Sequence, residues 1–294
     1  MIVTVSERAF TKLNLFLNVI GRREDGFHDI VSIMHAVSLC DELVVTGELA
    51  DSTEIVVTSS DPTLPTDESN LAYRSASKYL SHFNINAKIH IDILKKIPIG
   101  AGLGGGSSDA AATLRAMNKI FGLATKKQLL EIAAEIGSDV PFCLVGGYCF
   151  CSGRGEKINE LETNSALHFA VAIGDERIST PDAYRKLDEK YDFFRNGEDK
   201  NLSRECVRLA AGLECREKIH HLFYNIFESV TELPSVCEIK KILIKSGAKV
   251  SLMSGSGPAV FGLFKNKLVA KFAVKRLNRL GYTAFYASSA FIKD

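Results

Sequence analysis

The chain has 294 residues, and at about 150 residues per domain this length indicates two domains. Hydrophobic residues make up 46% and charged residues 24%, which excludes a disordered or low-complexity chain. The 36 Lys and Arg residues balance 35 Asp and Glu residues, so no net field attracts nucleic acid or an anionic membrane, although this balance permits a local basic groove. We expect neither a nucleic acid partner nor an obligate protein partner.

No apolar run approaches the roughly 18 residues of a membrane-spanning helix. Glu7 and Arg8 stand where a secretory signal would be apolar. The seven Cys residues are odd in number and scattered, which disfavours a disulfide framework and favours a reducing compartment. We therefore expect a soluble, cytoplasmic protein of mixed α and β structure.

The first predicted element is a half-buried strand over residues 9–19, where leucines alternate with Lys12 and Asn14. Lys12 and Asn14 share the face opposite the leucines. Asp25-Gly26 is a hairpin turn signal, and His28 follows it. Further strands are predicted over residues 30–35, 43–46, 54–58 and 88–94, with a helix at 70–82 between the last two.

A glycine-rich segment, 98–106, follows the last of these strands and leads into a helix that Gly122 ends after Phe121. Ser107, Ser108 and Asp109 suit its N-cap or first turn. A second helix covers 126–136, and the alternating pattern breaks at 146–155, where we place the domain boundary.

The second half has its own element order. A strand at 168–173 precedes several helices that end near Ser246. The remaining elements are strands 249–253 and 259–264, helix 267–280 and strand 283–291. This is the β-α-β-β-α-β order of a ferredoxin-like domain, with extra helices inserted after the first strand.

The segment from Gly100 to Gly106 holds five glycines in seven positions, and only Leu103 has a large side chain. Such a loop lets backbone N–H groups approach a ligand, and the helix that follows adds its positive dipole end. A capped helix after a flexible turn is the simpler alternative, but it does not require so many glycines. The pattern predicts a polyphosphate site.

Two familiar phosphate-binding folds do not fit this loop. Gly100, Gly102 and Gly105 satisfy G-x-G-x-x-G, but no acidic residue ends a strand about 20 positions later, and the preceding strands are expected to be antiparallel. A Walker A loop needs Gly-Lys-Ser/Thr, which the sequence lacks.

The segment 98–111 (PIGAGLGGGSSDAA) resembles the central motif of the GHMP kinases, the family of galactokinase and of homoserine, mevalonate and phosphomevalonate kinases. Residues 9–17, 25–28 and 137–142 resemble one branch, which phosphorylates the C2 hydroxyl of a cytidine diphosphate-linked methylerythritol in non-mevalonate isoprenoid synthesis. The motifs run in family order to about residue 264. The resemblance implies an α+β fold, with an ATP-binding domain of mixed or antiparallel sheet and helices at 1–155 and a ferredoxin-like domain at 156–294.

The resemblance assigns ATP, with Mg²⁺, to the glycine segment and its helix, through Pro98, Gly100, Gly102, Leu103, Gly104, Gly105, Gly106, Ser107 and Ser108. Asn70 matches a position near the adenine, although an N-cap role explains it equally well. Mg²⁺ is typically held by phosphates and one or two protein ligands, of which Ser107 or Ser108 is a candidate.

The resemblance makes Asp139 the catalytic base and Lys12 the cation that stabilises the moving phosphoryl group. From the sequence alone, Asp139 is as readily an N-cap before Val140-Pro141, and a lysine on a strand face is usually only solvated. Asn14 is a candidate substrate residue or a residue that orients Asp139.

Phe27 and His28 correspond to the pair that holds the cytosine ring. Phe27 departs from the tyrosine common in the branch, which preserves stacking but removes a phenol. Thr180 is either a substrate neighbour or a helix cap, and backbone donors at Gly255, Ser256 and Gly257 suit the substrate's diphosphate. We interpret Cys149 and Cys151 as buried strand residues, because two thiols alone do not form a zinc site.

Two other functions remain open from the sequence. The first keeps the fold but phosphorylates homoserine, mevalonate or a sugar, and Phe27-His28 weighs against it because those acceptors have no base to stack. The second is a ligand sensor without enzymatic activity, which Lys12 and Asp139 disfavour because a binding protein does not need a proton acceptor.

Overall fold

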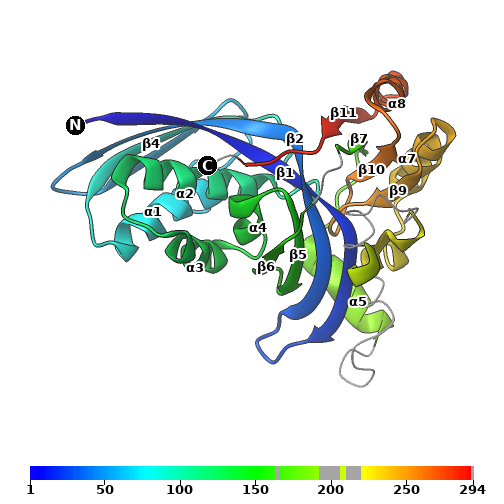
Figure 1. The fold of residues 1–294 in the computed structure, drawn as a ribbon, viewed down its shortest axis with the longest axis horizontal. Helices are drawn as coiled ribbons and strands as arrows, with labels where there is room; N and C mark the ends of the chain where they lie inside the picture. Colours follow the sequence, from blue (N-terminus) through cyan, green and yellow to red (C-terminus); the bar gives the residue numbers. More distant parts are fainter. Residues whose placement is uncertain (163–165, 192–205, 210–219, 293–294) are drawn as a thin grey trace. The chain divides into compact units, whose positions relative to one another are not determined.

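The computed structural model describes residues 1–162, 166–191, 206–209 and 220–292. The chain forms two compact units, neither of which is continuous in sequence (Figure 1). The first unit comprises residues 1–11, 40–99 and 104–145, and the second comprises 12–39, 100–103 and 146–294. This division places residues 12–39 with the C-terminal half of the chain. The predicted single domain boundary at residue 155 would instead place them in the N-terminal domain. That boundary stays a prediction.

Two long strands contribute to both units. Strand β1 spans Val3–Arg22 and strand β2 spans His28–Leu49. We predicted only residues 9–19 of β1 and two separate short strands within β2. Residues 36–42 contain neither Gly nor Pro, so the chain has no turn signal at which β2 would end.

In the first unit, β4 (Ala87–Leu94) pairs antiparallel with the second half of β2 and parallel with β3 (Glu54–Ser59). Helix α1 (Leu71–His82) connects β3 to β4, so these elements form a parallel crossover. The expectation that the strands before the glycine segment are antiparallel rather than β-α-β is therefore wrong for β3 and β4, whereas the expected mixed sheet is confirmed. The glycine segment still differs from a dinucleotide loop, because α2 is followed by another helix rather than by a strand.

Side chains along β4 alternate strictly between buried and exposed positions. The buried face meets the helices, which lie on one side of these strands in Figure 1. The helices are α1, α2 (Gly105–Phe121), α3 (Lys126–Ile136) and α4 (Val140–Val145). Close packing at Gly47 of β2, where an added Cβ would lie 3.3 Å from Ile120, brings α2 against the sheet.

The second unit contains a four-stranded antiparallel sheet in the order β11-β7-β10-β9. Its strands are β7 (His168–Ile173), β9 (Val250–Met253), β10 (Val260–Phe264) and β11 (Thr283–Ser288). In chain order these are the first to fourth strands, so the sheet order is 4-1-3-2, as a ferredoxin-like domain requires. The predicted second-half topology is confirmed, although β11 ends three residues earlier than predicted.

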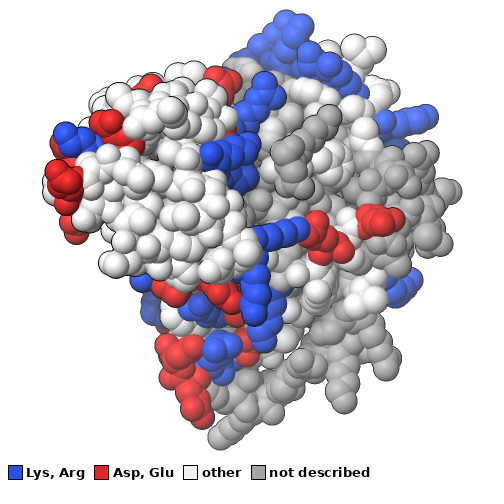
Figure 2. All heavy atoms as spheres, turned by 60° about the vertical axis from the view of Figure 1, so that its left-hand side comes forward, with Lys and Arg blue, Asp and Glu red and all other residues white. Residues whose placement is uncertain are grey.

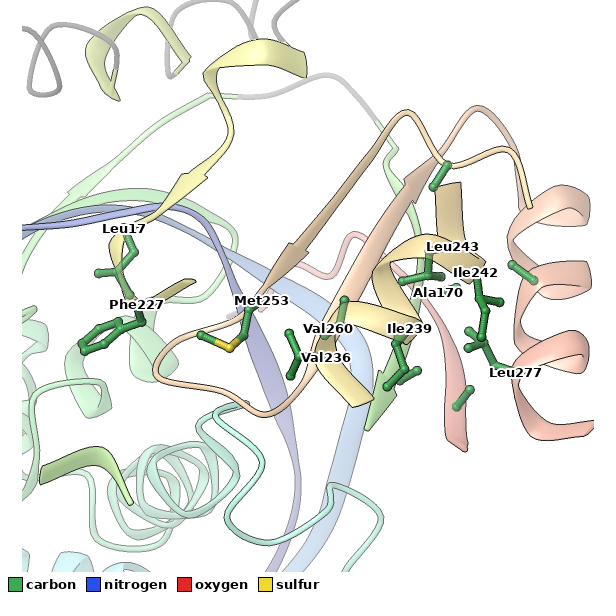
Figure 3. Packing of buried hydrophobic residues seen from close by; sticks show 14 of the residues in the cluster. Leu17, Ala170, Phe227, Val236, Ile239, Ile242, Leu243, Met253, Val260 and Leu277 are labelled. Carbon is green, nitrogen blue, oxygen red and sulfur yellow. The ribbon is translucent and has the colours of Figure 1, made fainter. Parts of the chain in front are cut away.

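Helices α7 (Pro234–Lys245) and α8 (Lys267–Arg279) pack on this sheet, and α5 (Thr180–Lys190) follows β7. Figure 3 shows Ile239, Leu243 and Leu277 from the two helices near Ala170 of the sheet. The same apolar cluster includes Leu17 of β1 and Phe227. The core of the second unit therefore extends to the strand that carries Lys12 and Asn14.

Short elements complete the second unit. Strand β5 (Tyr148–Gly153) pairs antiparallel with the first half of β2 and with β6 (Lys157–Glu160). Strand β8 (Tyr224–Asn225) pairs parallel with β1, and two 3₁₀ turns flank it, η1 (His220–Leu222) and η2 (Ile226–Ser229).

Among the described residues, no helix combines the length and apolar character that crossing a membrane would require. On the face drawn in Figure 2, acidic and basic side chains both occur, and several of them lie next to one another beside a large uncharged area. This distribution agrees with the near-zero net charge of the sequence.

Candidate active site

The glycine segment changes units between Leu103 and Gly104. Gly100, Gly102 and Gly104 all have positive φ, between 70° and 76°, a conformation that favours glycine. Gly104 is the N-cap of α2, so the helix begins earlier than the serines, and Ser107 and Ser108 lie in its first turn. No side chain caps this helix, which leaves its first N–H groups directed at the loop.

Ser108 points into the protein rather than toward the loop surface. Its hydroxyl lies 2.7 Å from the carbonyl of Phe10 and 2.9 Å from that of Gly104, and its side chain is buried. A hydroxyl has one proton to donate, and the Ser108 hydroxyl donates it to these backbone carbonyls. The half-buried Ser107 is therefore the better placed of the two serines to meet a ligand.

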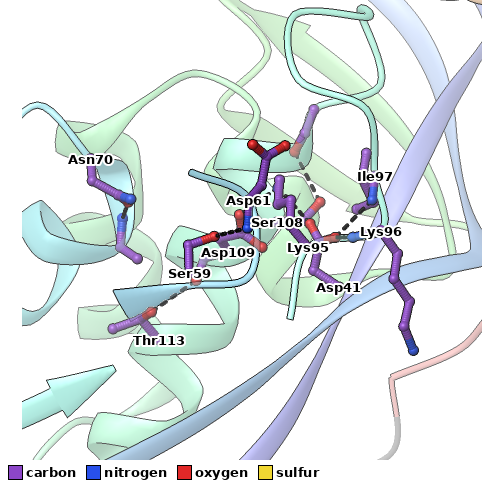
Figure 4. A network of polar contacts seen from close by, with 12 residues as sticks. Asp41, Ser59, Asp61, Asn70, Lys95, Lys96, Ile97, Ser108, Asp109 and Thr113 are labelled. Atoms are coloured by element: carbon purple, nitrogen blue, oxygen red, sulfur yellow. Dashed lines mark hydrogen bonds and ion pairs between the residues drawn. The ribbon is translucent and has the colours of Figure 1, made fainter. Parts of the chain in front are cut away.

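A buried ion cluster lies under the first turn of α2 (Figure 4). The ammonium of Lys95 lies 2.7 Å from Asp109 Oδ2 and 2.5 Å from Asp41 Oδ2. Asp41 also accepts from the backbone N–H groups of Lys96 and Ile97, at 2.5 and 2.7 Å. Asp41 thus anchors the segment that leads into the glycines, and we did not predict this role.

Burial raises the pKa of Asp109 to about 8, with the nearby charge of Asp41 adding to the effect and that of Lys95 opposing it. The two carboxylates raise the pKa of Lys95, even though burial alone would lower it. The other oxygen of Asp109, Oδ1, is buried without a hydrogen-bond partner among the described residues. Lys95 is thus a cation whose charge the fold already satisfies.

Asn70 caps α1, as one of the two interpretations predicts. Its side-chain oxygen accepts from Ala72 N at 2.8 Å, and its amide donates to Pro65 O at 2.6 Å. Asp139 immediately precedes α4, and its carbonyl accepts from Cys143 N at 3.0 Å. Asp139 and Lys12 belong to different units, and their cooperation stays a prediction.

In the second unit, Lys12 and Asn14 are both buried on β1, so Lys12 is not a solvated surface residue. Lys12 Nζ donates to Asn14 Oδ1 at 2.7 Å, and Asn14 Nδ2 donates to Ser32 Oγ at 2.9 Å. Ser32 in turn donates to the carbonyl of Phe16. Asn14 orients the ammonium through a neutral oxygen, which does not neutralise its charge.

Two glycine turns pack together beside this pair. A Cβ on Gly102 would lie 2.7 Å from the carbonyl oxygens of both Ser254 and Gly257, so only glycine fits there. Ala259 N donates to Ala101 O at 3.0 Å, which ties the turn at 254–257 to the first half of the glycine segment. A Cβ on Gly255 would lie 3.4 Å from Lys12 Nζ.

Two polar residues that we did not predict, buried Asn225 and half-buried Glu228, hold the turn at 254–257 in place. Asn225 donates to the carbonyls of Met253 and Gly255, at 2.7 and 2.8 Å. Glu228 accepts from Met253 N at 2.7 Å and pairs with Lys240. Asn225 and Glu228 are three residues apart and form no recognisable sequence motif. Their contacts with the turn are therefore visible only in the structure.

Thr180 is the first residue of α5, and Ser179 is its N-cap, so the capping role predicted for Thr180 is wrong. Instead, the hydroxyl of Thr180 lies 2.8 Å from that of Ser256. This bond joins α5 to the turn beside Lys12. The structure thus gathers the predicted residues Lys12, Asn14, Thr180, Gly255 and Ser256 in the second unit.

His28 and Phe27 have different surroundings. His28 is buried, with its ring stacked on Tyr184 at a centroid distance of 4.7 Å and its Nε2 2.7 Å from Asp188 Oδ1. Phe27 is 50% exposed, and the Arg154 guanidinium lies over its ring at 4.9 Å. An exposed aromatic face is available for a planar ligand to stack on.

Cys149 and Cys151 are buried strand residues of β5, as predicted. Among the described residues, no group of three or more His, Cys, Asp or Glu side chains is arranged to hold a metal ion.

The sequence profile of the GHMP kinases N terminal domain matches residues 70–147, and that of the GHMP kinases C terminal matches 210–283. A 4-diphosphocytidyl-2-C-methyl-D-erythritol kinase of Caldicellulosiruptor saccharolyticus is 40% identical over 92% of this chain and 91% of its own. The chain belongs to this kinase family. The kinase of the same name from Bacillus subtilis strain 168 is 39% identical and covers 88% of each chain.

Solved structures give the same assignment. A crystal structure of a 4-(cytidine 5'-diphospho)-2C-methyl-D-erythritol kinase matches with a TM-score of 0.79 and 32% identity, over 97% of this chain and 98% of that one. Mevalonate kinase of L. major, at 14% identity, has a TM-score of 0.78 over 100% of this chain and 98% of its own, which is a likeness of fold. The predicted two-domain α+β kinase fold is confirmed, and this member of the kinase family uses ATP.

Proposed function

We propose that the chain transfers the γ-phosphoryl group of ATP to the C2 hydroxyl of 4-diphosphocytidyl-2-C-methyl-D-erythritol, a step of non-mevalonate isoprenoid synthesis. The observation that carries this proposal is the joining of the glycine segment to the turn at 254–257 beside buried Lys12. The names of the kinases reported above specify this substrate, and these kinases match nearly the whole chain.

The helix N-terminus supplies the binding groups for the triphosphate. Free N–H groups of the first turn of α2 and the positive helix end attract phosphate oxygens. Positive φ at Gly100, Gly102 and Gly104 lets the backbone follow the ligand closely. Asn70 would meet the adenine with the hydrogen-bonding capacity that its two internal bonds leave unused.

Mg²⁺ bound with the nucleotide would neutralise phosphate charge, and Ser107 fits as its protein ligand. Ser108 fits less well, because its hydroxyl is already engaged by two carbonyl oxygens. Mg²⁺ prefers oxygen ligands, and the Ser107 hydroxyl would supply one from the first turn of α2, beside the bound phosphates.

For the transfer itself, we assign proton acceptance to the carboxylate of Asp139 and charge stabilisation to the ammonium of Lys12. The proton leaves the C2 hydroxyl for an Asp139 oxygen as that hydroxyl oxygen bonds to phosphorus and the bond to ADP breaks. Asn14 keeps Lys12 Nζ in place. Backbone donors at Gly255, Ser256 and Gly257 would hold the substrate's diphosphate, and Thr180 fixes Ser256.

The cytidine would lie against the exposed face of Phe27 and beside His28. This aromatic group favours a substrate with a planar base over homoserine, mevalonate or a sugar. We place the enzyme in the cytoplasm, without a nucleic acid or obligate protein partner, as the sequence predicts.

Release of ADP with three acceptors tests the function. With purified enzyme, Mg²⁺ and ATP, we expect ADP formation with the cytidyl substrate at least a hundredfold faster than with mevalonate or homoserine. Faster turnover of either small alcohol would overturn the substrate assignment. ADP release in the absence of any acceptor would favour an ATPase. No ADP release with any of the three acceptors would favour a ligand sensor.

Asp139→Asn tests the proposed base. Because Asn cannot accept the proton, turnover should fall by about 10²–10⁴ while the KM values for ATP and for the cytidyl substrate change little. The neighbouring variant Ser138→Ala is the matched control and should keep its turnover. Undiminished turnover by Asp139→Asn would exclude Asp139 as the base.

A further inference from the structure

Asp188 of α5 holds the edge of the His28 ring. Its Oδ1 lies 2.7 Å from His28 Nε2, and both side chains belong to the second unit. Tyr184, one turn earlier on the same helix, stacks on the face of the imidazole at 4.7 Å with an interplanar angle of 25°. One helix therefore fixes both the plane of the ring and its rotation within that plane.

The contact with Asp188 also decides where the imidazole carries its proton. A carboxylate accepts hydrogen bonds but has no proton to give when ionised, so His28 Nε2 must be the N–H donor. In the neutral ring, Nδ1 then has a lone pair and accepts. Arg22 Nη1 lies 3.3 Å from Asp188 Oδ2, which holds the carboxylate from its other side.

An acceptor at Nδ1 distinguishes two pyrimidine bases. Cytosine presents an amino group at C4, which donates, whereas uracil presents a carbonyl oxygen there, which accepts. Two acceptors that face each other leave a desolvated group without a partner, and such a mismatch gives strong discrimination.

We propose that Asp188 is a positioning residue that fixes His28 as the Nε2–H tautomer and thereby selects a cytidine-linked substrate over a uridine-linked one. This inference rests on the proposed function, because it assumes that the base of the substrate lies at His28. Asp188 itself acts through His28 and need not touch the base.

Asp188→Ala is the first test, with Glu189→Ala as the matched control. Glu189 is the next residue on α5, is exposed, and pairs with Arg185 rather than with His28. Asp188→Ala should raise the KM for the cytidyl substrate more than tenfold and leave kcat and the KM for ATP within about twofold. The preference in kcat/KM for the cytidyl substrate over its uridine diphosphate-linked analogue should fall more than tenfold. The control should change none of these values.

The tautomer is measured separately by the ¹⁵N shifts of His28 in the ligand-free protein. We expect a protonated Nε2 and an unprotonated Nδ1 in the native chain, and a mixture of tautomers in Asp188→Ala. Asp188→Asn keeps the shape of the side chain, so it provides the same test if the alanine variant does not fold. Its amide can face either tautomer, and it should also give a mixture.

An unchanged tautomer in both variants would overturn the role of Asp188, as would an unchanged preference for cytidine. If the native enzyme instead fails to phosphorylate the cytidyl substrate, the proposed function fails. In that case a tautomer shift would still show that Asp188 positions His28, so the two failures are distinguishable.

Discussion

The two units each contain a buried lysine beside a glycine turn, and the two lysines have different surroundings. Lys95 lies between the carboxyl groups of Asp41 and Asp109, so the fold itself supplies its acidic partners. Lys12 donates to the amide oxygen of Asn14, which positions the ammonium but carries no opposite charge. The comparison predicts that Lys95 stabilises the start of α2, whereas the proposed function gives Lys12 a role on the phosphoryl group.

The largest effect on stability is expected at Lys95. Lys95→Met removes the ammonium and leaves Asp41 buried without its cation, which should cost about 3–5 kcal/mol of unfolding free energy. Lys12→Met is the matched variant, and it should cost less, about 1–3 kcal/mol, because the partner of Lys12 on its own strand, Asn14 Oδ1, is a neutral oxygen rather than a buried acidic group. Urea denaturation at pH 7 measures both. Equal losses would remove the distinction between the two lysines.

A pH series sharpens the account of the Lys95 cluster. The pKa of Asp109 is about 8 in the folded chain and near 3.8 in the unfolded chain, so between these pH values the folded state holds a proton that the unfolded state releases. The native chain should therefore lose stability from about pH 4 to pH 8, with a slope that approaches about 1.4 kcal/mol per pH unit.

Asp109→Asn removes this titration and keeps the shape of the side chain. Its advantage in unfolding free energy over the native chain should grow from pH 4 to pH 8 and stay constant above pH 8. A difference that does not vary with pH would mean that Asp109 stays ionised beside Lys95 throughout this range.

A smaller effect is expected at Asn14, which orients Lys12. Asn14→Ala removes both the acceptor of Lys12 Nζ and the donor to Ser32. Because the ammonium remains but loses its fixed position, kcat should fall about tenfold, which corresponds to about 1.4 kcal/mol. Steady-state kinetics checks this, and Asn14→Asp serves as a second probe, since a carboxylate would neutralise Lys12. A larger loss in Asn14→Asp than in Asn14→Ala is expected, and the reverse order would contradict the orienting role.

The sequence predicts much of the site because its signals are local. The alternation along β1 puts Lys12 and Asn14 on one face, and five glycines in seven positions indicate a loop that approaches a ligand. The 4-1-3-2 sheet follows from the element order of the second half. These features depend on residues close together in the chain.

The unpredicted parts of the site depend on distant residues. Lys95 and Asp41 are separated by 54 positions, and His28 and Asp188 by 160. No spacing rule links such pairs, since only the pairing of β2 with β4 and the position of α5 bring them together. Asp41 nevertheless has one local signal in the sequence. It is a charged residue in a stretch of strand without turn residues, which indicates a carboxyl group that needs a partner.

The single-turnover rate of Lys12→Met tests the central claim most directly. The native enzyme and the variant are mixed with saturating ATP, Mg²⁺ and cytidyl substrate, and the affinity for ATP is measured in parallel. We predict a rate of phosphoryl transfer lower by at least a hundredfold, with the dissociation constant of ATP changed less than threefold. A transfer rate within threefold of the native value would show that Lys12, like Lys95, serves only the fold.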